Sequence, residues 1–137
     1  MKRFIILKII TVGILFLSFS IGYAQEPTTG DLSVQESAIC LDVIDRAPVG
    51  AGNIFPKNVP KLFCFTKIVG ADKPTSVTHM WYHNGLLKSK VKLPVKSASW
   101  RTWSAMTLTP DNAGGEWMVE IISEDGVALD SLIFIIK

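Results

Sequence analysis

The stretch V-T-H-M-W-Y-H-N-G, residues 77–85, decides the fold. In an extended chain, alternate side chains point to opposite sides, so the stretch divides into two sets. One set holds Val77, His79, Trp81 and His83. The other set holds Thr78, Met80 and Tyr82. Asn84 and Gly85 then tolerate the positive φ angles of a tight type I′ turn. We therefore expect a strand over residues 77–84, central to an all-β domain, that runs into a hairpin.

The returning strand is expected over residues 87–95, where apolar and basic side chains alternate. Its core side would carry Val91, Leu93 and Val95. Its other side would carry Lys88, Lys90, Lys92, Pro94 and Lys96. Lysines and proline hinder the pairing of an exposed strand with another sheet, so this strand is expected at a sheet edge. Binding of an anion is the alternative interpretation of the lysines.

Five further stretches are typical of strands because they alternate or are strongly apolar: residues 38–43, 61–68, 100–108, 117–121 and 127–136. Segments rich in Gly, Pro and Asn separate them, including residues 45–53, which are expected to be a loop. Seven short strands with no helical period predict a two-sheet β-sandwich of immunoglobulin-like type. A small closed barrel is the alternative.

The first 24 residues have the pattern of a secretory signal peptide. Lys2 and Arg3 precede a long apolar run, and a small-x-small cleavage site ends at Ala24. A retained membrane anchor is the alternative, since an apolar run of about 20 residues could just span a bilayer. Residues 25–37 are then expected to be a flexible linker and residues 38–137 the β-sandwich domain. Cleavage predicts a periplasmic or secreted protein with no retained membrane span.

The charge of the chain changes when this leader is removed. Three of the 14 Lys and Arg residues are lost, which leaves 11 against 12 Asp and Glu. A nearly neutral chain lacks the positive charge by which proteins bind nucleic acids, so no nucleic-acid partner is expected. The remaining 113 of the 137 residues are enough for one domain with a modest core.

Cys40 and Cys64 could form a disulfide after export. If the strands that carry them pair antiparallel, both side chains would project from the same face of one sheet. A bridge then requires that the two residues lie opposite each other, with Cα atoms within about 7 Å. Two buried thiols are the alternative. The absence of a C-x-x-C spacing argues against a redox motif.

His79 and His83 lie four residues apart, which is about 13 Å along an extended strand. One zinc ion, with ligand distances of about 2 Å, cannot bind both, and no metal or other cofactor is expected. His79 shares its side of the strand with Trp81, so the simplest interpretation is a buried histidine whose ring nitrogens are hydrogen-bonded. Catalysis would need a hydroxyl beside it, and Ser104 or Thr102 on a neighbouring strand could supply one.

The most distinctive motif is S-W-R-T-W-S, residues 99–104. Trp100 and Trp103 would face opposite sides of a strand, so at least one indole would be partly exposed. Trp103 shares its side with Arg101, and such a pair either braces the surface or forms a platform for a ligand. Tyr82, which points away from the side that holds Trp81, could extend that platform. The candidate ligand-binding residues are His79, Tyr82, Trp100, Arg101 and Trp103.

Three motifs of this chain point to a known family: V-T-H-M-W-Y-H-N-G (residues 77–85), S-W-R-T-W-S (99–104) and G-E-W-M-V-E-I (115–121). They resemble the motifs of a bacterial family known as domain of unknown function number 2914. D-R-A-P-V-G (45–50) and C-F-T (64–66) fit the same pattern. The resemblance covers roughly residues 38–136 and implies a small domain of exported or envelope-associated bacterial proteins. It implies no activity and no ligand, so no site residue is transferred from it.

These observations predict an exported, non-enzymatic binding or interaction module. Its expected partner is another envelope protein or a second copy of itself, bound through an aromatic surface beside Arg101. A glycan-binding module is one alternative, because exposed indoles suit sugar rings. A small hydrolase centred on His79 is another alternative. Neither a catalytic set nor a metal site is predicted.

Overall fold

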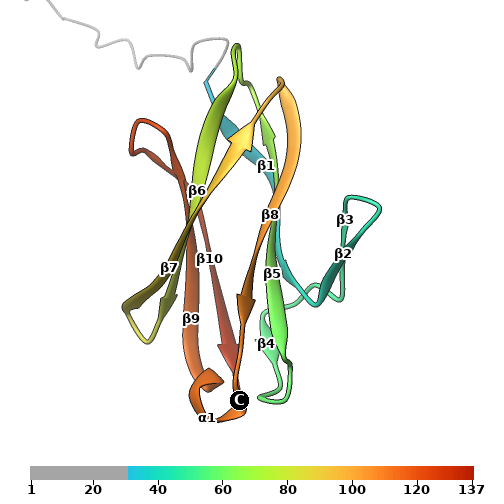
Figure 1. Cartoon of the computed structure of the whole chain (residues 1–137), viewed down its shortest axis with the longest axis vertical. Helices are drawn as coiled ribbons and strands as arrows, with labels where there is room; N and C mark the ends of the chain where they lie inside the picture. The colour runs from blue at the N-terminus through green and yellow to red at the C-terminus, as the bar shows by residue number, and fades with distance from the viewer. Residues whose placement is uncertain (1–30) are drawn as a thin grey trace, which may run out of the picture.

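The computed structural model describes residues 31–137, in which two large β-sheets pack face to face (Figure 1). The expected leader, residues 1–24, and residues 25–30 of the expected linker lie outside the described residues. Within residues 31–137, no helix is long and apolar enough to cross a membrane. The all-β, two-sheet architecture predicted from the sequence is confirmed.

The smaller sheet has three antiparallel strands in the order β1-β5-β8. They are β1 (Ser33–Cys40), β5 (Lys61–Val69) and β8 (Ser99–Thr107). The larger sheet has five strands in the order β4-β10-β9-β6-β7. They are β4 (Ile54–Phe55), β10 (Ala128–Ile136), β9 (Gly115–Ser123), β6 (Thr75–His83) and β7 (Leu86–Val95). The two-residue β4 runs parallel to β10, whereas the long strands of this sheet are antiparallel.

The predicted hairpin joins β6 to β7. Asn84 and Gly85 have φ angles of 49° and 82°, the positive values that a tight turn between twisted strands requires. β6 lies between β9 and β7, and β7 forms the edge of the larger sheet. The prediction that the lysine-bearing strand lies at a sheet edge is therefore confirmed.

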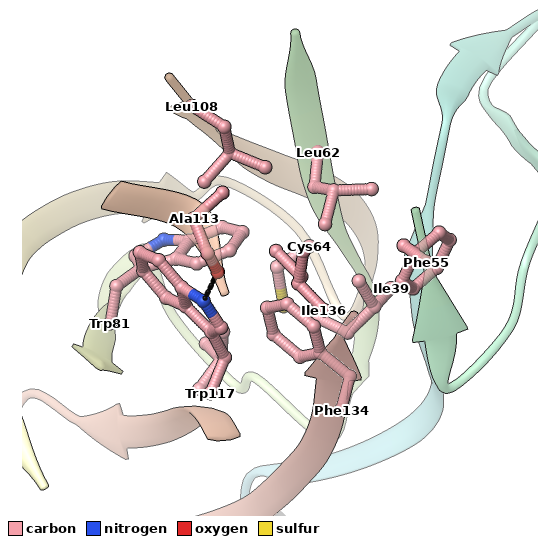
Figure 2. Close-up of a cluster of buried hydrophobic side chains, with 11 residues drawn as sticks. Ile39, Phe55, Leu62, Cys64, Trp81, Leu108, Ala113, Trp117, Phe134 and Ile136 are labelled. Atoms are coloured by element: carbon pink, nitrogen blue, oxygen red, sulfur yellow. Dashed lines mark hydrogen bonds between the residues drawn. The ribbon is translucent and has the colours of Figure 1, made fainter. Parts of the chain in front are cut away.

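Three aromatic rings of the larger sheet form the centre of the main apolar cluster between the sheets (Figure 2). Phe134 stacks on Trp117 with ring centroids 6.0 Å apart and lies edge-on to Trp81 at 6.3 Å. The smaller sheet adds Leu62 and Cys64 to this cluster. Burial of a large apolar side chain stabilises the fold by about 1.5–3 kcal/mol, so this cluster holds the two sheets together.

Two segments differ from the sequence prediction. β1 begins at Ser33, within the segment 25–37 that the sequence predicts as a linker. Residues 45–53, predicted as a loop, include the turn and second strand of a hairpin made of β2 (Asp42–Ile44) and β3 (Ala47–Val49). The hairpin projects from the sandwich in Figure 1. A short helix, α1 (Pro110–Ala113), precedes β9.

Cys40 and Cys64 are both buried and are not joined by a disulfide. The register of β1 with β5 places Ile39 opposite Cys64 and Phe63 opposite Cys40. Because side chains alternate, this offset of one residue directs the two thiols to opposite faces of the sheet. The predicted common face is therefore wrong, and the bridge that it would allow does not form. Burial raises the pKa of both thiols.

Candidate functional site

His79 lies on the core side of β6 and is completely buried. Its Nδ1 atom lies 2.7 Å from the hydroxyl of Ser104 on β8, and its Nε2 atom lies 3.2 Å from the hydroxyl of Thr66 on β5. The imidazole of the five-stranded sheet thus reaches two strands of the three-stranded sheet. The predicted buried, hydrogen-bonded histidine is found in this position.

The hydrogen bonds around His79 determine which ring nitrogen carries the proton. The Thr66 hydroxyl donates its proton to the Thr102 carbonyl oxygen at 2.9 Å, so it can only accept from the imidazole. The Nε2–H of His79 is therefore the donor to Thr66, and Nδ1 accepts the proton of the Ser104 hydroxyl. The Ser104 oxygen also accepts from the Trp81 indole N–H at 3.0 Å. We call this set of side chains, Thr66, His79, Trp81 and Ser104, the polar bridge.

The polar bridge contains a Ser–His pair, the arrangement that a hydrolase would use. Burial lowers the pKa of His79 to about 4, so the ring is neutral at pH 7. However, Ser104 is only 4% exposed and His79 has no exposed surface. The Nε2 atom of His79 is hydrogen-bonded to the Thr66 hydroxyl. In a catalytic triad, an acidic side chain would occupy this place and orient the histidine. In this conformation the geometry is that of a structural connection between sheets.

Trp100 and Trp103 face opposite sides of β8, as the alternation predicts. Trp100 is half-buried and packs against the inner apolar cluster of Ile68, Val77 and Ile121. Its guanidinium neighbour is Arg46 from the turn of the β2–β3 hairpin, with Cζ 5.9 Å from the ring centroid.

Trp103 lies on the outer face of the three-stranded sheet and is partly exposed. Its indole stacks on Phe65 of β5, with ring centroids 6.5 Å apart and an interplanar angle of 20°. Arg101, two residues along β8, is exposed on the same face opposite Lys67. We call the outward side chains Phe63, Lys67, Arg101 and Trp103 the Trp103 surface.

Tyr82 does not extend the Trp103 surface, and this prediction is wrong. It lies on β6, on the outer face of the other sheet, where it pairs with Met118 of β9. Its hydroxyl donates to the Met80 sulfur at 3.9 Å. The reason is topological, because β6 and β8 belong to different sheets and their outer faces point in opposite directions.

A hollow of about 610 Å³ lies where β6, β8 and α1 meet, and the sequence interpretation missed it. His83 lines it and stacks on Trp117 at a centroid distance of 4.3 Å. The His83 Nε2–H donates to the Gly114 carbonyl oxygen at 2.8 Å. Lys88 and Asp111 also line it, so its wall carries both charges. In the sequence, the alternation that places His83 on the same side of the strand as Trp81 was the available signal for this hollow. Nothing in the local sequence indicated that α1 would form its wall.

No group of three or more His, Cys, Asp or Glu residues could hold a metal ion in the described part of the chain.

Two comparisons place this geometry among known proteins. The model of the family described as "protein of unknown function (DUF2914)" matches residues 74–136. The resemblance to this family predicted from the sequence motifs is confirmed over residues 74–136. The match includes β6 to β10 and therefore His79, Tyr82 and the S-W-R-T-W-S motif. No curated protein matches the chain.

A comparison with solved structures finds the same fold in another protein. The crystal structure of an immunoglobulin-like protein from Pseudomonas aeruginosa aligns with a TM-score of 0.53 and 13% sequence identity. The alignment covers 80% of this chain and 99% of that chain. The predicted immunoglobulin-like β-sandwich is thus confirmed. The likeness at this identity concerns the fold alone.

Loss of the Ser104 hydroxyl should destabilise the protein more than loss of an exposed serine on the same strand. Ser104→Ala leaves the Trp81 N–H and the His79 Nδ1 unpaired in the core, and we expect a loss of about 2–4 kcal/mol. Ser99→Ala, at an exposed position of β8, should stay within about 0.5 kcal/mol. Urea unfolding of both variants measures the difference, and equal losses would contradict the polar bridge.

Acid should destabilise the protein through His79. The folded pKa of about 4 lies below the ordinary 6.5, so between these values the unfolded chain binds the extra proton. Stability is therefore complete above pH 6.5 and is lost as the pH falls towards 4, by up to about 3 kcal/mol. Urea unfolding at both ends of this range should show this fall in the wild type and in His83→Gln. The fall should be smaller in His79→Gln, and an equal fall there would refute the assignment.

Proposed function

We propose that this protein is a non-enzymatic interaction module that binds a protein partner through the Trp103 surface. The observation that carries the proposal is that the partly exposed indole of Trp103 stacks on Phe65, whose ring is completely buried. Phe65 has no exposed surface although it lies on the outer face of its sheet. Trp103 therefore rests on a rigid base and remains partly exposed to solvent.

Such a side chain is suited to binding because little freedom remains for it to lose. Ordering a flexible side chain costs about 0.5–1.5 kcal/mol on association, and a ring already fixed by stacking avoids most of this cost. Tryptophan and arginine are also the residue types most enriched among the side chains that dominate binding energy. Trp103 and Arg101 lie two residues apart on the same face of β8.

The charges of the Trp103 surface favour an acidic partner. Lys67 and Arg101 lie directly opposite each other on adjacent strands, so their positive charges are close together. Glu36 of β1 lies on the other side of Lys67 and offsets part of this charge. A partner that places an acidic side chain over Arg101 and an apolar group over Trp103 would match both features.

The non-enzymatic part of the proposal is supported by the state of the polar bridge. The Ser–His pair that could serve a hydrolase is buried in the core, and the Ser104 hydroxyl and both ring nitrogens of His79 already take part in hydrogen bonds within the polar bridge. Location outside the cytoplasm is also part of the proposal. It is supported by the signal-peptide pattern of residues 1–24 in the sequence.

Changes at the Trp103 surface should weaken partner capture without unfolding the protein. Arg101→Glu reverses an exposed charge, and Trp103→Leu removes the indole but keeps apolar cover over Phe65. Each should reduce capture of an envelope protein at least about tenfold, the loss expected of a hot-spot residue. Lys73→Glu, an equal charge reversal at an exposed loop position, is the control.

The measurement is affinity capture from envelope extract with the wild type and the three variants, after circular dichroism has shown that each is folded. Capture that is unchanged in Arg101→Glu and Trp103→Leu would refute the proposed surface. A glycan array, probed in parallel, would instead favour a sugar ligand if the same two variants lost binding there.

The proposed location predicts the mass of the mature protein. If the leader is cleaved after Ala24, the chain recovered from cells begins at Gln25 and is found in the periplasmic or secreted fraction. Mass spectrometry of the fractionated protein measures this. An intact N-terminus in the membrane fraction would indicate a retained anchor, and an intact N-terminus in the cytoplasm would refute export.

A further inference from the structure

An apolar row crosses the outer face of the five-stranded sheet. The cross-strand register places Ile133 opposite Met118, Met118 opposite Tyr82, and Tyr82 opposite Leu87. Paired residues of neighbouring strands point to the same face, so these four side chains form one continuous line over β10, β9, β6 and β7. We call this line the outer row.

The outer row is open to solvent. Ile133 is 58% exposed and Leu87 is 45% exposed, while Met118 and Tyr82 between them are partly exposed. Ile135 and Ile54, which pair with each other next to the row, are also exposed. Single exposed apolar side chains are ordinary on a protein surface. A contiguous set across four of the five strands of a sheet instead marks an interaction surface.

The neighbouring row carries charges at defined places. It consists of Ser131, Glu120, Met80 and Lys90 on the same four strands. Lys90 therefore lies at the β7 edge of the face, and Glu120 lies near its middle. The hydrogen bond from the Tyr82 hydroxyl to the Met80 sulfur connects the two rows.

We propose that this face binds the same face of a second copy of the chain, related by a two-fold axis that runs along the strands between β6 and β9. Such an axis reverses the order of the strands across the interface. Leu87 then packs on Ile133 of the second copy, and Tyr82 packs on Met118. The outer row is self-complementary under this operation, as a two-fold interface requires.

The positions of the charged side chains favour this axis over a two-fold axis that runs across the strands. Under the proposed axis, Lys90 lies over Ser131 of the second copy and one strand away from Glu120, within reach of a lysine side chain. A two-fold axis across the strands would instead stack β7 on β7 and bring lysines together. Like charges in an interface cost free energy, so the charge pattern selects the first arrangement.

The size of the face sets the expected affinity. Four strands at about 4.8 Å and nine residues at about 3.3 Å give a face of roughly 600 Å². Stable complexes bury about 800 Å² per partner, so a weak dimer is expected, with a Kd of about 10–100 µM. The inference is independent of the Trp103 surface, which lies on the other sheet.

Two adjacent leucines provide a matched test. Leu87 belongs to the outer row, whereas Leu86 pairs with His83 and points to the other side, although it is 65% exposed. Sedimentation equilibrium should show a dimer when the protein, purified in the form in which cells produce it, is measured at concentrations of about 1–500 µM. Leu87→Glu should weaken it at least about tenfold, and Leu86→Glu and Trp103→Leu should leave it unchanged.

Charge reversal tests the direction of the axis. Lys90→Glu and Glu120→Lys should each weaken the dimer, and the double variant should recover most of the wild-type affinity. A monomer throughout the concentration range would overturn the inference. Three other results would also overturn the inference. They are equal effects of Leu86→Glu and Leu87→Glu, loss of the dimer in Trp103→Leu, and no recovery of affinity in the double charge variant.

Discussion

The polar bridge is the physical constraint on which the sandwich depends. Most of the contact between the sheets is apolar and non-directional, so many relative positions of the two sheets would bury similar areas. The hydrogen bonds of His79 with Thr66 and Ser104 are directional and lie among buried side chains. A shift of one sheet would leave several of these groups unpaired, at about 1–3 kcal/mol each. The bridge therefore selects one arrangement of the sheets.

This arrangement decides which aromatic side chains are left outside. With Ser104 held inward, alternation along β8 turns Trp103 outward. With His79 and Trp81 held inward, alternation along β6 turns Tyr82 outward on the opposite side of the sandwich. The domain consequently presents two separate surfaces, one basic and aromatic and one apolar with lysines at its edge. We propose that the first surface binds a protein partner and that the second binds another copy of the chain.

Much of the fold could be predicted because it follows from local alternation and turn chemistry. The opposite orientation of Trp100 and Trp103 and the tight turn at Asn84-Gly85 depend on residues next to each other in the chain. The errors about the two cysteines and about Tyr82 concern how segments that are distant in the chain are arranged. An offset of one residue between β1 and β5 separates Cys40 from Cys64, and no local pattern encodes that register. Arg46 reaches Trp100 because a hairpin forms over 50 residues earlier in the chain.

The sequence by itself determined the class of fold, the long strands and the side of the strand on which each aromatic residue lies. These properties depend on side-chain periodicity, which is a property of short segments. Only the tertiary structure decided which faces lie together. It brought a serine and a histidine into a closed bridge, placed Tyr82 and Trp103 on opposite sides, and aligned four strands into one exposed apolar row. The physical reason is that sheet membership and register are set by the packing of the whole core.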